Sequence, residues 1–173
     1  MAEESGDRVA RIQSEWRRER PDIDVSPQGV IGRLHRLAGA LTHELVAVYR
    51  QHGLGEGEFD VLATLRRCGA PYERAPGDLA AHTMVTTGAM SKRIDRLEAE
   101  GLVSRRQADP TEEGVVDGRR RLVALTPAGL ELIDAAFADH MANEARLVAE
   151  LDRADRADLE RILTRWLARH ESP

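Results

Sequence analysis

Residues 85–106, VTTGAMSKRIDRLEAEGLVSRR, predict a short helix with two very different sides. Its apolar residues recur at helical spacing and should form one buried stripe: Met90, Ile94 and Leu97. Thr86 or Thr87 is expected to cap the amino end, and Gly101 to end the helix. The other side carries small and polar residues, together with the only lysine of the chain, Lys92.

The charge of this region differs from that of the whole protein, whose formal net charge is −5. From Lys92 to Arg106 there are five basic and three acidic residues, and three consecutive arginines follow at 119–121. Proteins bind DNA through local cations that neutralise phosphates, so the net charge alone does not decide the matter. The distribution of charge therefore leaves DNA binding open.

The order of the elements around this helix is that of a winged helix-turn-helix. A helix is predicted over 57–67, a short one over 76–82, and then the helix above. Two β-prone runs follow, 102–107 and 119–126, around a polar loop, and they predict a hairpin. The expected fold class is mainly α with a small β-hairpin wing.

In a winged helix-turn-helix the second helix of the pair enters the major groove with its amino end nearest the bases. Small residues at that end would let the helix approach the duplex closely, and its polar side chains would donate hydrogen bonds. The predicted DNA contacts on this helix are Thr86, Thr87, Gly88, Ser91, Lys92 and Arg93. The alternative is an ordinary capped surface helix, for which such residues are unremarkable.

The rest of the chain predicts a single helical domain. Aromatic residues make up only 3% of the 173 residues, which favours aliphatic helices over a β-sandwich. Further helices are expected over about 7–18, from a Ser26 cap with Pro27, from Thr126 with Pro127, and near the carboxyl end. No apolar run approaches a membrane span and no signal core is seen, so a cytoplasmic location is expected.

The sequence offers little for catalysis or for metal binding. It contains no nucleophile–base pair or carboxylate pair with catalytic spacing, and an enzyme is not expected. Its six histidines show no paired metal spacing, so neither a metal nor another cofactor is predicted. Cys68 is the only cysteine; a redox sensor is one interpretation, but a lone cysteine is more often inert.

Several segments together resemble the MarR family of bacterial transcription regulators over about residues 27–165. They are GEFDVLATLRR at 57–67, the helix above, LVSRR at 102–106, ADP at 108–110 and DGRRRLVALTPAG at 117–129. The resemblance implies a homodimer joined by the first and last helices, whose two recognition helices meet a pseudo-palindromic double-stranded DNA operator. It also implies a wing arginine in a minor groove, which alignment on DGR places at Arg119, with Arg120 as a phosphate contact or strand residue.

On this basis the chain is expected to divide into three segments of one structural domain. Residues 1–55 would hold an extra helix and a dimerisation helix, 56–126 the winged helix-turn-helix, and 127–173 further dimerisation helices. Two features depart from the usual family pattern. The wing loop, 110–118, is longer and carries two glutamates, and Ala75 stands where a capping Thr or Ser would suit the following helix.

The amino-terminal part is similar to the urate-responsive, PecS-like branch of that family. The similarity lies in an extra helix with a tryptophan, followed by RPDID at 20–24 and GVIGRL at 29–34. It implies four ligand-binding residues: Trp16, Asp60, Arg93 and Arg105. Trp16 would offer an aromatic face to a flat ligand, and Arg105 a planar fork for its negative charge.

A mechanism follows as a hypothesis. Asp60 would hold Arg93 in the ligand-free state, and an anion beside Asp60 would disturb that pair and move the recognition helix. Each residue also has a purely structural interpretation: Trp16 as a packing residue, Asp60 as a cap or ion-pair partner, and Arg105 as a phosphate contact. Urate, another purine or a small anionic metabolite would satisfy the same groups.

The function predicted from the sequence is a homodimeric DNA-binding regulator, most simply a repressor released by a small anionic aromatic ligand. Three alternatives remain open at this point. The chain would be a ligand-unresponsive DNA binder, a cysteine-redox-responsive one, or a helical dimer that acts through protein contacts.

Overall fold

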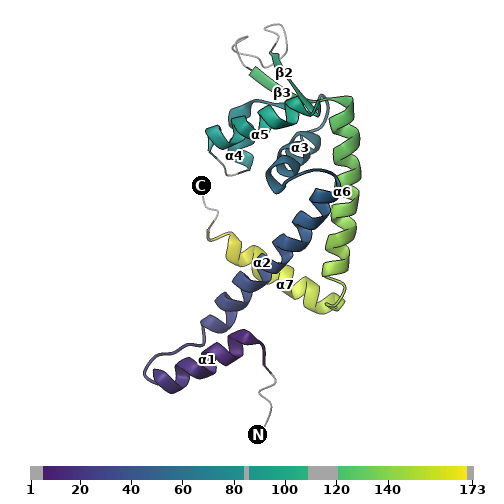
Figure 1. The fold of residues 1–173 in the computed structure, drawn as a ribbon. Helices are drawn as coiled ribbons and strands as arrows, with labels where there is room; N and C mark the ends of the chain where they lie inside the picture. Colours follow the sequence, from purple (N-terminus) through teal and green to yellow (C-terminus); the bar gives the residue numbers. More distant parts are fainter. Residues whose placement is uncertain (1–5, 84–85, 109–120, 171–173) are drawn as a thin grey trace. The chain divides into compact units, whose positions relative to one another are not determined.

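The computed structural model describes residues 6–83, 86–108 and 121–170. The helices in these ranges are α1 (Arg8–Glu19), α2 (Gln28–Gln51), α3 (Glu56–Arg67), α4 (Pro76–His82), α5 (Thr87–Ala99), α6 (Pro127–Leu147) and α7 (Arg153–Leu167). The strands are β1 (Glu73–Arg74), β2 (Val103–Gln107) and β3 (Arg121–Leu125) (Figure 1). None of the described helices combines the length and the apolar character that crossing a membrane requires.

The chain divides into two compact units, residues 1–44 and 45–173, and the boundary falls inside α2. We call them the amino-terminal unit and the carboxy-terminal unit. The first contains α1 and most of α2. The second contains the end of α2 and every later element, among them the predicted winged helix-turn-helix.

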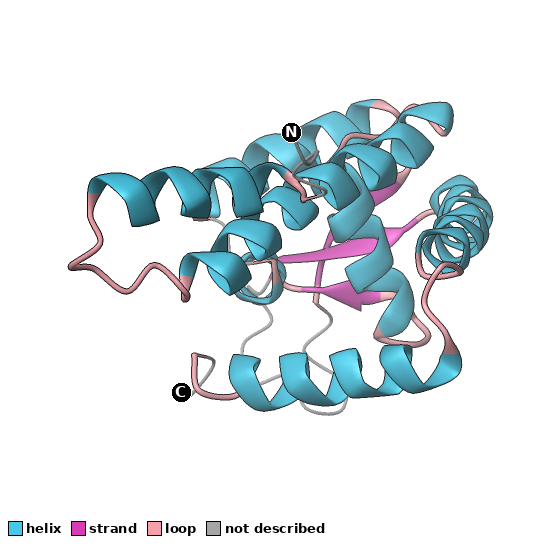
Figure 2. Ribbon diagram, turned by 90° about the horizontal axis from the view of Figure 1, so that it is seen from below, coloured by secondary structure: helices cyan, strands magenta, loops and turns pink. Residues whose placement is uncertain are grey.

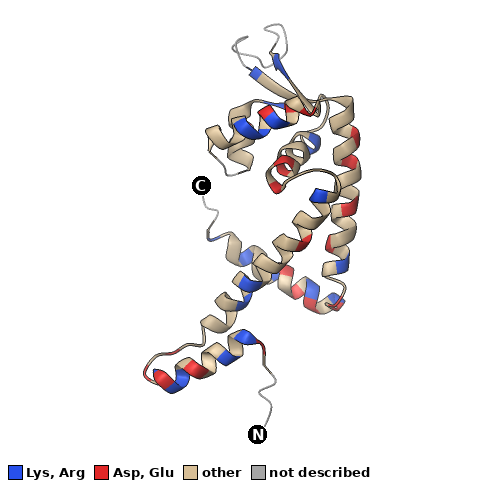
Figure 3. Ribbon diagram, in the orientation of Figure 1, with Lys and Arg blue, Asp and Glu red and all other residues tan. Residues whose placement is uncertain are grey.

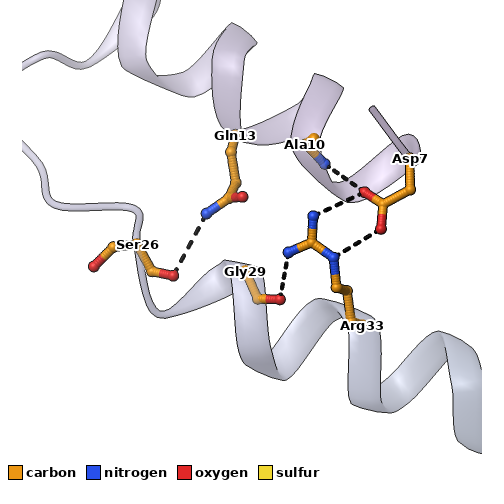
Figure 4. A network of polar contacts seen from close by, with 6 residues as sticks. All are labelled: Asp7, Ala10, Gln13, Ser26, Gly29 and Arg33. Atoms are coloured by element: carbon orange, nitrogen blue, oxygen red, sulfur yellow. Dashed lines mark hydrogen bonds and ion pairs between the residues drawn. The ribbon is translucent and has the colours of Figure 1, made fainter. Parts of the chain in front are cut away.

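Polar contacts join α1 to the start of α2 in the amino-terminal unit (Figure 4). The Asp7 carboxylate caps α1 by accepting from the Ala10 N–H at 2.9 Å, and it also accepts from Arg33 Nε of α2 at 2.7 Å. Gln13, which is buried, donates from Nε2 to the Val25 carbonyl at 2.8 Å. These contacts hold the extra helix predicted from the sequence against the helix that follows it.

The predicted Ser26 cap of α2 is wrong. The Ser26 hydroxyl instead donates to Asp24 Oδ2 at 2.9 Å, and the Ser26 N–H donates to Asp24 Oδ1 at the same distance. The helix begins at Gln28, and the first carbonyl to accept from a residue four positions later is that of Pro27, from the Ile31 N–H. The Ser26 hydroxyl is hydrogen-bonded to Asp24 because the turn brings the two residues together.

The carboxy-terminal unit has a continuous core built mainly from aliphatic side chains. The apolar residues with almost no exposed surface are Val61, Leu62, Leu65, Leu79, Met90, Ile94, Leu97, Val103, Val123 and Ile133. Its aromatic part is small: Tyr49 and Phe59 stack with ring centroids 4.0 Å apart, and the His140 ring lies 5.1 Å from Phe59. Figure 2 shows how small a part the strands form of this largely helical fold.

The predicted hairpin is present and belongs to a three-stranded sheet with the order β1-β3-β2. β2 and β3 are antiparallel, in register from Val103 opposite Leu125 to Gln107 opposite Arg121. The third strand, β1, pairs with β3 through Glu73 opposite Ala124 and was not predicted. Two charged residues carry no alternating pattern, so nothing local marks them as a strand.

Thr126 joins the sheet to α6. Its Oγ1 accepts from the Gly129 N–H at 3.0 Å, as the predicted cap requires, and donates to the Gly101 carbonyl at 2.7 Å. The final helix, α7, begins at an Asp152 cap that accepts from the Asp155 N–H at 2.8 Å. None of the residues of α7 is buried within one chain.

Candidate nucleic-acid interface

The recognition helix, α5, has one side buried in the core, as predicted. Thr86 is its cap, and Thr86 Oγ1 accepts from the Ala89 N–H at 3.3 Å. The helix ends before Gly101, which adopts a left-handed conformation with φ of 72°. Its stripe of Met90, Ile94 and Leu97 is at most 1% exposed. Full burial of such a side chain contributes about 1.5–3 kcal/mol, so this stripe fixes how the helix is rotated about its axis.

That rotation leaves the predicted DNA-contacting side of α5 in the solvent. Thr86, Thr87, Gly88, Ser91 and Lys92 are all exposed. A β-carbon built on Gly88 would meet no atom within 4 Å, so the amino end of the helix is unobstructed. The backbone N–H groups at a helix amino end attract phosphate. Figure 3 shows basic residues on α5 and on the adjoining strands β2 and β3.

Arg93 differs from the other predicted contacts because it lies on the side of α5 that faces α3. A β-carbon built on Gly57 of α3 would lie 2.3 Å from Cζ and 2.3 Å from Nε of Arg93. The Arg93 Nη1 atom is buried and has no hydrogen-bond partner. The guanidinium therefore packs against the backbone of α3 instead of pointing outwards.

A second basic side chain, Arg96, joins α5 to α3 one turn further along. Arg96 Nη1 lies 3.6 Å from Glu58 Oε1, and its Nε donates to Glu100 at 3.1 Å. Solvent screens surface pairs of this kind, so each contributes little to stability. The buried stripe therefore holds the helix more strongly than these surface charges do.

Arg105 on β2 ties the wing to the recognition helix. It forms ion pairs with Asp95 and Glu98 of α5, and its backbone N–H donates to Glu98 Oε1 at 3.2 Å. Partial burial disfavours the charge, but the hydrogen bonds to these two carboxylates outweigh it and raise the pKa of Arg105. The guanidinium predicted to bind a ligand is thus engaged by two acidic side chains.

Arg105 also lines a hollow of about 370 Å³ between the recognition helix and the wing. The other lining residues come from α4, α5 and β3: Pro76, Ser91, Ile94, Asp95, Arg121, Leu122 and Val123. The lining combines apolar side chains with two arginines, the Ser91 hydroxyl and the Asp95 carboxylate. The two guanidinium groups offer planar donors to an anion, and the Asp95 carboxylate repels one.

The neighbouring Arg106 points to the other face of the sheet. Its Nε donates to Glu73 Oε2 of β1 at 2.8 Å, and its Nη2 pairs with the same carboxylate. The unpredicted strand therefore supplies a partner for a basic residue of the wing. Of these two neighbouring arginines of β2, Arg105 is the one that lines the hollow.

Asp60 is half-buried on α3. Burial raises the pKa of its carboxyl above the usual value, and the nearby Glu56 raises it further. Three basic side chains oppose the rise: Arg93, Arg67 and His140. Arg93 is thus an electrostatic neighbour, but within the described residues it forms neither an ion pair nor a hydrogen bond with Asp60, and it lies against Gly57 instead.

Trp16 lies on α1 in the amino-terminal unit, and its side chain is 49% exposed. It lines a mainly apolar hollow of about 340 Å³ together with Arg20, Ile23, Asp24, Val25, Pro27 and Gln28. An exposed tryptophan face of this kind is available to a flat ligand or to another apolar surface. It is not a buried packing residue of its own unit.

The four predicted ligand residues are distributed over several places. Arg93 and Asp60 are close enough to interact at the α3–α5 contact, Arg105 is held by α5 acids in the wing hollow, and Trp16 belongs to the other unit. Sequence reasoning missed the residues that restrain the two arginines: Gly57, Asp95 and Glu98. The i, i+3 spacing of the two acids marks a shared helix face, but no sequence pattern linked them to Arg105.

Some predicted residues lie outside the described part of the chain, namely Arg119, Arg120 and the long wing loop, 110–118. Cys68 is described; it is partly buried, and its Sγ donates to the Leu65 carbonyl at 2.9 Å. Within the described ranges, no three His, Cys, Asp or Glu side chains gather as metal ligands would.

The chain is similar to known transcription regulators over most of its length. Residues 52–113 match the MarR family. The HTH-type transcriptional regulator PecS of Dickeya dadantii is 35% identical over 159 residues, which cover 91% of either chain. An HTH-type transcriptional repressor of Mycobacterium bovis is 31% identical, over 81% of this chain and 93% of that one.

A solved structure of a MarR family regulator is similar to this fold. The structure of AbsC, a MarR family transcriptional regulator from Streptomyces coelicolor, has a TM-score of 0.71 at 25% identity and covers 86% of this chain and 96% of AbsC. The helix pair α4–α5 and the adjoining three-stranded sheet form a winged helix-turn-helix. The chain belongs to the MarR family of transcriptional regulators.

The burial of Asp60 has a consequence for the pH dependence of stability. Because its folded-state pKa is raised, the charged carboxylate opposes folding at neutral pH, and this opposition is lost as the pH falls through that pKa and below 3.8. Asp60→Asn should therefore raise the urea midpoint of unfolding slightly at pH 7, and its advantage should shrink towards pH 3. The exposed Asp158→Asn removes the same charge as a control. A lower midpoint for Asp60→Asn at pH 7 would show that attraction to Arg93 outweighs burial.

Proposed function

We propose that this regulator is a homodimeric, sequence-specific DNA-binding repressor, released from a pseudo-palindromic operator by a small anionic aromatic ligand such as urate. The carrying observation is the division of α5 into a fully buried stripe and an exposed polar amino end. A helix held so firmly from one side presents the other side in one orientation, which reading base edges requires.

In this proposal the exposed residues of α5 make different contacts with DNA. Thr87 and Ser91 donate to base edges, Lys92 reaches phosphate, and Gly88 allows a close approach. The helix amino end at Thr86 adds attraction for phosphate. Arg119 and Arg120 are proposed to contact the minor groove and the flanking phosphates, as in related wings. Arg93 contributes from behind the helix, through its contact with α3.

The first test is fluorescence anisotropy on DNA from upstream of the gene, over a series of salt concentrations. Wild-type protein should bind tightly, and its affinity should fall steeply with salt because several phosphates are neutralised. Lys92→Ala should weaken binding about 10-fold and reduce the salt slope by about two, one for each subunit of the dimer. Arg50→Ala removes one exposed charge from α2 and should change neither quantity. If a genome-wide selection of binding sites also finds none, the helical protein-interaction dimer replaces this proposal.

A second copy of the chain is the proposed partner of the exposed apolar residues. They lie on helices near both ends of the chain: Val30, Ile31, Leu37, Phe137, Met141, Leu159, Ile162, Leu163 and Leu167. On α7 they follow helical spacing and form one stripe, although nothing on that helix is buried within one chain. Exposed apolar surface of this extent is typical of a protein–protein interface.

Dimerisation can be tested on α7 itself. Leu163→Arg places a charge in the apolar stripe and should convert a dimer of twice 19.2 kDa into a monomer, as measured by light scattering. Ala157→Arg adds the same side chain on the opposite side of α7 and should leave the molar mass unchanged. A wild-type monomer at micromolar concentration would contradict the proposed assembly.

The proposed effector residues are Trp16, Asp60, Arg93 and Arg105. Their chemistry supports an anionic, flat ligand: an exposed aromatic face, two guanidinium groups and a carboxyl that already carries its charge at a cost. Binding at Arg105 would compete with Asp95 and Glu98, which join the wing to α5. A ligand that breaks those pairs changes the support of the recognition helix, and couplings of about 1–3 kcal/mol are usual.

The effector is tested by titrating urate, other purines and small aromatic anions into the protein–DNA complex. An effective ligand should weaken DNA binding about 5- to 150-fold. Trp16→Ala should reduce this response without altering DNA affinity in the absence of ligand, and Trp16→Phe, which keeps an aromatic face, should retain most of it. If no compound acts, the ligand-unresponsive alternative holds. If oxidation acts and Cys68→Ser abolishes the effect, the redox alternative holds.

A further inference from the structure

We infer that Gly57 is a positioning residue for DNA recognition: by lacking a side chain it admits the Arg93 guanidinium between α3 and α5, and so fixes the amino half of the recognition helix. The inference rests on the proposed DNA binding and deepens it. Gly57 is the second residue of α3 and lies far in sequence from the helix that it serves.

The geometry leaves no room for any other residue at position 57 while Arg93 stays in place. A β-carbon there would lie 2.3 Å from Cζ, 2.3 Å from Nε and 2.7 Å from Nη2 of Arg93. Carbon atoms in contact are normally about 3.5–4.0 Å apart. Three atoms of one planar group therefore occupy the space that every other amino acid would need.

Arg93 lies over Gly57 without a hydrogen bond from its Nη1 atom. Nη1 is buried and has no partner, and Asp60, one turn along α3, acts on Arg93 only through its charge. A buried donor without a partner is unfavourable, so Nη1 of Arg93 stays buried only while the packing of α3 and α5 encloses the guanidinium. Removing the space should therefore move the guanidinium.

Such a movement changes α5 without unfolding the protein. The clashing atoms form the end of a long flexible side chain, whereas the helix itself is held by Met90, Ile94 and Leu97. A displaced guanidinium must either separate the two helices or leave the contact for the solvent. If the helices separate, Ser91 and Lys92 leave the position from which they would contact DNA. If the guanidinium leaves, the amino half of α5 loses its contact with α3 and is held by the buried stripe alone.

The test is a double-mutant cycle between Gly57→Ala and Arg93→Ala, measured by anisotropy on operator DNA and on a scrambled duplex. Gly57→Ala should weaken operator binding about 10-fold, with less effect on the scrambled duplex, and should cause no further loss when Arg93 is already alanine. Gly77→Ala is the matched control. Gly77 is likewise the second residue of its helix, α4, and a β-carbon there would meet nothing within 4 Å.

The thermal midpoints of the same four proteins test the contact without DNA. Alanine is favoured over glycine within a helix, so Gly77→Ala should raise the midpoint. Gly57→Ala should raise it less in the wild-type background, because the guanidinium is displaced, and this deficit should vanish in the Arg93→Ala background. This readout stays decisive if the wild-type protein binds no DNA, an outcome that would refute the proposed function but not the contact. Should Gly57→Ala fail to fold, restored folding in the double variant supports the inference, and its absence overturns it. Operator affinity equal to wild type, or independent losses from the two substitutions, also overturns it.

Discussion

The packing of one side of α5 into the core is the constraint on which the rest of this structure depends. Met90, Ile94 and Leu97 are enclosed by the side chains of the carboxy-terminal unit, so the helix can neither rotate nor slide without exposing them. Their burial decides which residues remain in the solvent. The position of the polar face of α5 thus follows from the burial of the apolar face. Thr86 caps the helix at the amino end of the polar face.

The pairing of charged side chains around this helix matters more than the net charge of the protein. The protein is acidic overall, yet acids near the candidate DNA face are engaged: Asp95 and Glu98 by Arg105, and Glu100 by Arg96. Paired carboxylates repel phosphate less than free ones because the partner cation cancels part of their field. An acidic chain can in this way keep a face that is compatible with DNA.

Two arginines restrain α5 from different directions, and this suggests how a signal would reach it. Arg93 joins the helix to α3, and Arg105 joins it to the wing. Neither contact is part of the hydrophobic core, so each can change while the fold persists. Regulation requires two arrangements of similar free energy, and exchangeable ionic contacts at the edge of a fixed helix allow that more readily than a packed core does.

Local pattern in the sequence determined the helices, a cap at Thr86 or Thr87, the cap at Thr126, the buried stripe of α5 and the hairpin, because each depends on residues close together in the chain. Short-range chemistry also misled at Ser26, where Asp24 competes for the hydroxyl. Only the tertiary structure decided that β1 extends the sheet, that Arg105 pairs with α5, and that Arg93 lies over Gly57. These contacts join residues that are distant in sequence. The packing of the helices and strands decides which side chains meet, and no single segment of the sequence encodes that packing.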